Sequence, residues 1–292
     1  MRFAEIGQQL RAYRLESGLR AEEIAARLGV SRAALYRYEK GEVIKLDTIR
    51  RLAELLKISP LSLLGIGVEY FARPVAFQER LRQVEEQADQ ILQVGGPLCH
   101  AVTTEAFDSA LNEAWGELAD ASPDRVLARA AAEQMLGILA ARKKLYQVRR
   151  PTVIAILGEG ALRRLLREGL VSGVALSERT RQRCRAAARA EAEILAGLME
   201  SVPIGMQIGL LAGPEPSAPF VVLRERERAH VVGSPFAPDT YPAAGLGIGF
   251  ITSADEAVGT HQRVAEAAWR DALKGAQAAE RLRAILRETA EG

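Results

Sequence analysis

Residues 22–42 read EEIAARLGVSRAALYRYEKGE, and this stretch decides how the first part of the chain folds. Ile24 and Leu28 lie on one face of an amphipathic run, and Leu35 lies on the inner face of a second run. Between them, Gly29 can take the left-handed conformation that ends a helix, and Ser31 is a favoured N-cap for the next helix. The stretch therefore predicts two helices joined by a tight Gly-Val-Ser turn.

The flanking sequence adds further short helices. Ile6 and Leu10 begin an apolar stripe that Gly18 ends, and LDTIRRLAELL around Leu52 repeats the helical spacing. Pro60 suits the first turn of a short last helix, PLSLLG. We expect a five-helix, all-α domain over residues 1–68.

This order of helices resembles the helix-turn-helix domain of the Cro/repressor-like family of regulators, also called the xenobiotic-response-element (XRE) family. The residues that carry the resemblance are GLRAEEIAARLGVSRAALYRYEKGE and LDTIRRLAELLKISPLSLL, within residues 5–65. The resemblance implies a domain that binds double-stranded DNA, and a protein that acts as a homodimer on half-sites about one helical turn apart.

By this resemblance, the third helix lies in the major groove. Arg32 and Arg37 are expected to read bases, because an arginine can donate two parallel hydrogen bonds to guanine. The alternative is a pair of solvated arginines on a surface helix. The family often carries Thr-Gln where this chain has Arg20-Ala21, so Arg20 is expected to contact a phosphate instead. The expected DNA-binding residues are Arg20, Ser31, Arg32, Ala33, Ala34, Tyr36, Arg37 and Lys40.

The resemblance also implies a structural ion pair. Arg14 and Glu39 match family positions that join the first and third helices. Loss of one partner would leave a buried charge without its counter-charge.

A helical connector is expected over residues 69–149. In FQERLRQVEEQADQILQV (77–94), apolar residues recur at spacings of four and three, as along the seam of a coiled coil. This helix could mediate dimerisation or pack within its own chain, and the spacing does not distinguish the two. Further helices are expected over about 104–118 and from Ser122 to about Val148.

Residues 150–292 have a different pattern, typical of an α/β domain with a mixed sheet. Short apolar runs alternate with long amphipathic segments. The expected strands are TVIAIL from Thr152, IGMQIGLL (204–211), FVVL (220–223), HVV (230–232) and LGIGFI (246–251).

No catalytic motif is found in this domain. ILGEGALRRLL lacks the Gly-Lys-Ser/Thr ending of a phosphate-binding loop and the third glycine of a dinucleotide fingerprint, and no GxSxG elbow occurs. Cys99 and Cys184 have no metal-ligand spacing. From Pro203 onward the order of strands and loops resembles phospholipase-D-like sensor domains without the catalytic HxK, which implies binding without turnover. We expect no enzyme activity, cofactor or metal.

Candidate effector residues lie near the expected strands. LRERER (223–228) would place its arginines on one face if extended, where they could hold a carboxylate or phosphate. The alternative is an exposed charged hairpin. Pro-rich loops at 212–219 and 233–245 are long enough to act as lids. The candidate effector residues are Arg224, Arg226, Arg228 and Tyr241.

The net charge of the chain does not by itself indicate a nucleic-acid binder, but the charge is uneven. Residues 1–70 hold 12 Lys/Arg against 9 Asp/Glu, a net of +3, whereas the whole chain has +2. No signal peptide or membrane span is visible, so a soluble cytoplasmic protein is expected. The sequence predicts a homodimeric transcription regulator, such as a repressor, that senses a small molecule. Two alternatives are a DNA-binding head fused to a divergent hydrolase, and a DNA-binding subunit of a complex such as an antitoxin.

Overall fold

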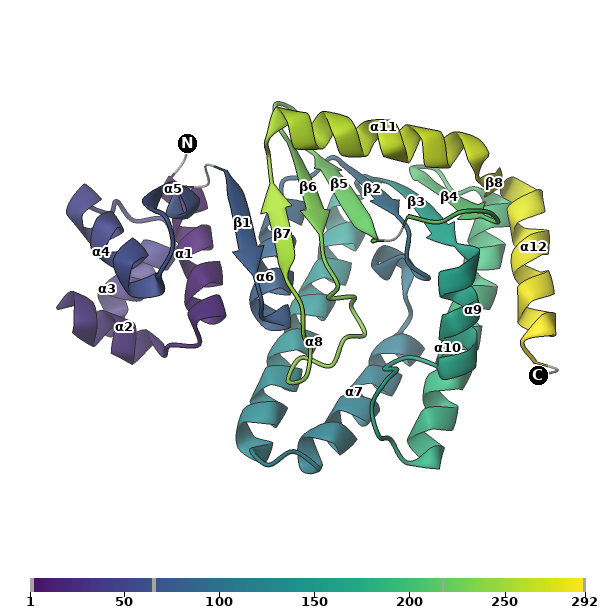
Figure 1. Cartoon of the computed structure of the whole chain (residues 1–292), viewed down its shortest axis with the longest axis horizontal. Coiled ribbons are helices and arrows are strands. Elements are labelled where there is room, and N and C mark those ends of the chain that lie inside the picture. Colours follow the sequence, from purple (N-terminus) through teal and green to yellow (C-terminus); the bar gives the residue numbers. More distant parts are fainter. Residues whose placement is uncertain (1–2, 65–66, 217, 291–292) are drawn as a thin grey trace.

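A computed structural model describes residues 3–64, 67–216 and 218–290. The first part is a compact helical head, which lies at one side of a larger α/β body in Figure 1. The helices of the head are α1 (Phe3–Ser17), α2 (Ala21–Leu28), α3 (Arg32–Glu39), α4 (Leu46–Leu56) and α5 (Pro60–Leu63).

Local signals end and begin the head's helices as the sequence predicts. Gly29 has a φ of 71° and caps α2, and the Ser31 hydroxyl accepts a hydrogen bond from the Ala34 N–H at 3.1 Å. Leu35, on the inner face of α3, is completely buried. Gly7 allows α1 to approach the end of α3 closely, since a Cβ there would lie 2.4 Å from the Tyr38 carbonyl oxygen.

The described part of the body contains one eight-stranded sheet. Its strand order is β1-β7-β6-β5-β2-β3-β4-β8. Strands β2, β3 and β4 are parallel, and every other pairing is antiparallel. The strands are β1 (Val68–Phe71), β2 (Gln90–Val94), β3 (Thr152–Gly158), β4 (Met206–Leu211), β5 (Phe220–Arg224), β6 (Ala229–Gly233), β7 (Gly249–Thr252) and β8 (Leu273–Lys274).

Helices cover both faces of this sheet (Figure 1). One face packs against α11, and the opposite face packs against α6, α9, α10 and α12, with α7 and α8 beyond them. Because both faces are covered, the strands are continuous apolar runs. The body's helices are α6 (Pro74–Glu85), the 3₁₀ helix η1 (His100–Val102), α7 (Glu105–Asp120), α8 (Arg125–Arg149), α9 (Glu159–Glu168), α10 (Glu178–Ser201), α11 (Asp255–Asp271) and α12 (Gly275–Glu288).

The expected fold class, a helical head followed by an α/β domain with a mixed sheet, is confirmed. The helix expected over 77–94 was wrong, because α6 ends at Glu85 and residues 90–94 form strand β2. The expected boundary near residue 150 falls inside the sheet, since β2 pairs with β3. The region 69–149 therefore supplies strands as well as helices. The apolar residues of the expected seam, Phe77, Leu81, Val84, Ala88 and Ile91, are buried within this chain.

The head packs firmly against the body through α1 and α6. The Tyr13 ring stacks on Phe71 of β1 with centroids 5.6 Å apart. Gln9 donates a hydrogen bond to Glu69 at 3.3 Å, and Arg11 pairs with Glu79 at 3.2 Å. Apolar residues of both parts belong to one continuous core. Within the ranges described, no helix is both long enough and apolar enough to cross a membrane.

Candidate nucleic-acid interface and an internal cavity

The outer face of α3 carries the residues expected to contact DNA. Ser31, Arg32, Ala33, Arg37 and Lys40 are exposed, and Ala34 and Tyr36 are half-buried. Arg20 is the N-cap residue of α2 and is also exposed. The head therefore presents a row of small and basic side chains on one helix, which suits close approach to a groove edge.

Each of the three arginines on this surface is held by a carboxylate. Arg32 pairs with Glu22 at 2.7 Å and Arg37 with Glu42 at 2.7 Å. Arg20 pairs with Glu23 at 3.3 Å, and the Arg20 N–H lowers the pKa of that carboxyl by hydrogen bonding to it. A DNA phosphate or base that binds one of these arginines would compete with its glutamate.

Tyr36 lies between the exposed and the buried charges of the head. Its hydroxyl accepts a hydrogen bond from Arg32 at 3.3 Å, and the Arg32 guanidinium lies 5.3 Å from its ring centroid. The Arg14 guanidinium lies 6.0 Å from the same centroid. Tyr36 therefore contacts both Arg14 of α1 and Arg32 on the outer face of α3.

Arg14 and Glu39 form a bidentate ion pair between α1 and α3. The nitrogen–oxygen distances are 2.5 and 3.0 Å, and the side chains are only 13% and 6% exposed. Burial opposes the charged form of Arg14, but the hydrogen bond and charge of Glu39 outweigh it and raise the pKa of Arg14. The pair sets the orientation of α3 relative to α1.

Replacing Glu22 by glutamine is expected to strengthen binding to short duplex DNA by about three- to tenfold at low salt. The change frees Arg32 and removes a negative charge that would face the phosphates. The gain should shrink as salt screens the charges. Fluorescence anisotropy with labelled DNA measures it, with the exposed Glu133→Gln on α8 as control. Equal affinities for both variants would show that Glu22 does not restrain Arg32.

The structure places the candidate effector residues in two separate regions, with the three arginines in one and Tyr241 in the other. Residues 225–228 do not continue β5 but turn back into β6, with Glu225 N–H donating to the Arg228 carbonyl at 2.8 Å. This is the charged hairpin that the sequence offered as the alternative to an extended strand, and Arg224, Arg226 and Arg228 line one open pocket on it. Arg228 lies 3.6 Å from Glu5 of α1, so the hairpin faces the head. Tyr241 belongs to the loop that follows β6, and its side chain is buried in a core cluster of the body.

A cavity of about 230 Å³ lies at the opposite end of the strands, where β2 and β6 end and β5 begins. Its lining is mainly apolar, with Phe77, Phe107, Phe220 and Phe236 among the walls. The GGP segment at 95–97 and the Pro-rich loop 233–245 border it. Crevices at the carboxyl ends of strands are the usual ligand sites of α/β sheets. The Pro-rich loop was visible in the sequence, but the cavity beneath it was not.

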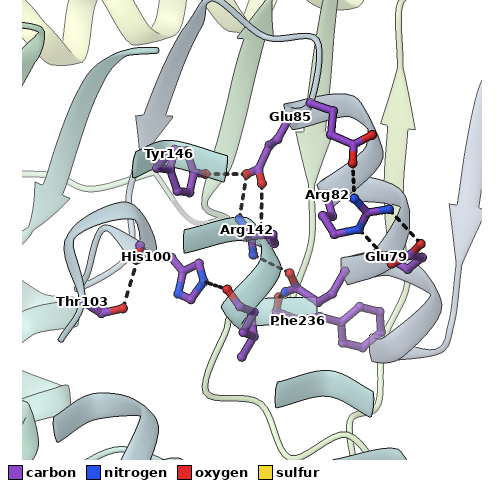
Figure 2. Close-up of polar contacts among 11 residues, drawn as sticks. Glu79, Arg82, Glu85, His100, Thr103, Arg142, Tyr146 and Phe236 are labelled. Carbon is purple, nitrogen blue, oxygen red and sulfur yellow. Dashed lines mark hydrogen bonds and ion pairs between the residues drawn. The ribbon is translucent and has the colours of Figure 1, made fainter. Parts of the chain in front are cut away.

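A buried polar network borders this cavity. Arg142 of α8 donates two hydrogen bonds of 2.7 Å to Glu85 of α6 and one of 2.6 Å to Gln78. The Tyr146 hydroxyl donates to the same carboxylate at 2.7 Å, as Figure 2 shows. Burial opposes the charge on Arg142, but Glu85 outweighs it and raises the pKa of Arg142. The network locks α6 to α8.

Comparisons with known proteins agree with the fold of the head. A family described as a helix-turn-helix domain matches residues 5–63. No curated protein matches the chain. Among solved structures, TrmBL2, an archaeal chromatin protein with a novel mode of DNA binding, is similar at 13% identity and a TM-score of 0.35. That match covers 78% of this chain and 62% of TrmBL2, and it is too weak to define a shared fold. The match identifies a helix-turn-helix domain at the head, a kind of domain that is typical of DNA-binding regulators.

Proposed function

We propose that this chain is a sequence-specific transcription regulator of the XRE type, which binds an inverted-repeat operator as a homodimer and responds to a small molecule in the body's cavity. The observation that carries the proposal is the position of α6. Phe77 and Gln78 of this helix line the cavity. The next residue, Glu79, pairs with Arg11 of the head, and Arg80 pairs with Glu69 of β1, which also accepts from Gln9 of the head. A ligand that displaces α6 would therefore displace the head.

An aromatic ladder runs from the cavity to the head. Phe236 and Phe77 both line the cavity, with ring centroids 5.8 Å apart. Phe77 lies 6.4 Å from Phe71, which stacks on Tyr13 at 5.6 Å. Tyr13 directly precedes Arg14, the residue that holds α3. Close-packed rings transmit small displacements because they have little free volume to absorb them.

A polar path runs beside the ladder. Arg80 makes a bidentate ion pair with Glu69 of β1 at 2.8 and 2.9 Å, and both side chains are 7% exposed. Glu69 also accepts from Gln9 of α1. These groups connect α6, β1 and α1 in one buried network, so α6 and the head move together.

A dimer is proposed because one head covers only one half-site. Helix-turn-helix proteins gain affinity by placing two heads about one helical turn of DNA apart, roughly 34 Å. The apolar residues of the seam expected over 77–94 are buried within the same chain, so another surface must join the two copies. A ligand that changes the head's position on each copy would change the spacing of the two heads, and a coupling of about 1–3 kcal/mol would regulate binding.

The proposal predicts that the full-length protein enriches a short inverted repeat from fragments of its source genome. Sedimentation of the complex should then give two chains per repeat. Mutating one half of the repeat should reduce affinity by at least about tenfold, because one head alone binds weakly. Absence of an enriched sequence, or one chain bound per site with no loss when one half is mutated, would contradict the proposal.

A further inference from the structure

The chemistry of the cavity lining indicates the class of ligand. Most of its side-chain donors are already engaged. Gln78 donates to the Phe236 carbonyl at 2.9 Å, and Gln93 donates to the Leu98 carbonyl at 2.7 Å. Arg142 directs three of its nitrogens to Glu85 and Gln78. These contacts leave few donors for a ligand and leave the side-chain carbonyl of Gln93 as an acceptor.

Four prolines remove further donors from the lining, because proline has no backbone N–H. They are Pro97, Pro219, Pro235 and Pro238. An anion such as a phosphate or carboxylate is bound in proteins by converging N–H groups and free cations. Among the described residues that line the cavity, Arg142 is the one lysine or arginine, and Glu85 neutralises it, so they offer no free cation of this kind. The anionic effector expected from the arginine-rich hairpin therefore does not suit this cavity.

His100 contributes an acceptor rather than a charge. It is 5% exposed, and its Nε2 lies 3.1 Å from the Leu139 carbonyl oxygen. Burial, reinforced by the positive charge of Arg142, holds the pKa of His100 well below its usual range, so the ring is neutral. A carbonyl oxygen only accepts, so Nε2 carries the proton. Nδ1 is then a buried acceptor, and it has no partner among the described residues.

Asp239 contributes the negative charge. It lines the cavity from the loop after β6. Burial raises the pKa of its carboxyl, and among the described residues only backbone N–H groups, its own and that of Val171, oppose this. Arg164 borders a neighbouring pocket that Asp239 also lines, but no described lysine or arginine lowers this pKa. A carboxylate in a half-buried apolar site is stabilised by a cation that enters beside it.

We propose that the cavity binds a small hydrophobic amine in its protonated form, with Asp239 supplying the counter-charge and the other lining acceptors receiving ammonium hydrogen bonds. The apolar part of the amine packs among the phenylalanines, whose ring faces also attract a cation. This inference deepens the proposed function by naming the ligand class of the same cavity, and it rests on that function where regulation is concerned.

Isothermal titration of the full-length protein tests the ligand class. The probes are benzylamine, phenethylamine and cyclohexylmethylamine, each with its matched alcohol and carboxylate. At least one amine should bind about tenfold or more tightly than its alcohol, because a charge-assisted hydrogen bond is roughly twice as strong as a neutral one. Its carboxylate should bind more weakly still. Binding of no amine, or an alcohol or carboxylate that equals its amine, overturns the proposal.

Two variants test whether Asp239 is the counter-charge of the bound amine. Asp239→Asn keeps an acceptor for the Val171 N–H and should reduce amine binding to the level of the alcohol. Asp271→Asn, at an exposed position at the end of α11, should leave the preference unchanged. If Asp239→Asn retains the amine preference, Asp239 is not the counter-charge and the proposal fails.

Operator binding separates this inference from the proposed function. The amine should change the operator affinity of the wild type by about fivefold or more, and Phe71→Leu should bind the amine normally but lose this response, because the aromatic ladder is broken. Amine binding without any change in operator affinity would support the ligand class and overturn regulation. A neutral or anionic compound that changes operator affinity, where no amine does, would support regulation and overturn the ligand class.

Discussion

Replacing Arg32 and Arg37 together by alanine is expected to reduce operator affinity by roughly 30-fold or more, the largest functional effect that we predict. Both side chains are exposed on α3, where each pairs with a surface glutamate and Arg32 also contacts Tyr36. A bidentate arginine–guanine contact discriminates against a wrong base by about 5- to 150-fold. Breaking the surface ion pairs costs little, because exposed pairs contribute little stability.

The specificity of the loss distinguishes base reading from general charge. Affinity for unrelated DNA should fall much less than affinity for the operator, because phosphate contacts elsewhere on the head persist. The matched control is Arg129→Ala/Arg183→Ala, which removes two exposed, ion-paired arginines from the body. If operator affinity of the Arg32/Arg37 variant stays within about twofold of this control, α3 does not read bases through its arginines.

Replacing Arg142 by methionine is expected to destabilise the body by about 3–5 kcal/mol, the largest effect on stability. The side chains of Arg142 and Glu85 are 6% and 2% exposed, so the variant leaves a carboxylate buried without its cation. Only Tyr146 still donates to it. The melting temperature should fall by about 10 °C, which calorimetry on the full-length protein measures.

A second substitution tests the cause of this loss. Arg142→Met/Glu85→Gln removes the unpaired charge while keeping an acceptor for Tyr146, and it should recover about half of the lost melting temperature. The control Arg149→Met removes an arginine on the same helix whose pair with Asp89 is exposed, and it should unfold with the wild type. A drop no larger for Arg142→Met than for Arg149→Met would exclude the buried pair as a source of stability.

The head could be predicted because its signals are local. Gly29 directly follows the helix that it ends, and Ser31 directly precedes the helix that it begins. The helical spacing of nearby residues is enough to predict that Leu35 faces the core. The Arg14–Glu39 pair joins helices that pack in a fixed order. The surface ion pairs that hold the arginines were not predicted, although Glu22, Glu23 and Glu42 were visible beside them.

The structure of the region after the head was harder to predict, because its apolar residues fit the spacing of a helix although part of the region forms a strand. Ile91 and Val94 continue the spacing of α6, yet they belong to β2, which pairs with β3 and β5. Val68–Phe71 pairs with β7 from near the end of the chain. A strand's backbone hydrogen bonds are made with distant segments, so its neighbours are not encoded within the strand.

By itself, then, the sequence determined a helix-turn-helix head with basic residues on its third helix, followed by an α/β body, because caps, spacing and apolar runs act over short stretches. Only the tertiary structure decided that α6 touches both the head and a cavity, and that His100, Arg142 and Asp239 border this cavity together. Those residues come from η1, α8 and the loop after β6. They meet because strands and helices far apart in the chain pack together at one end of the central strands.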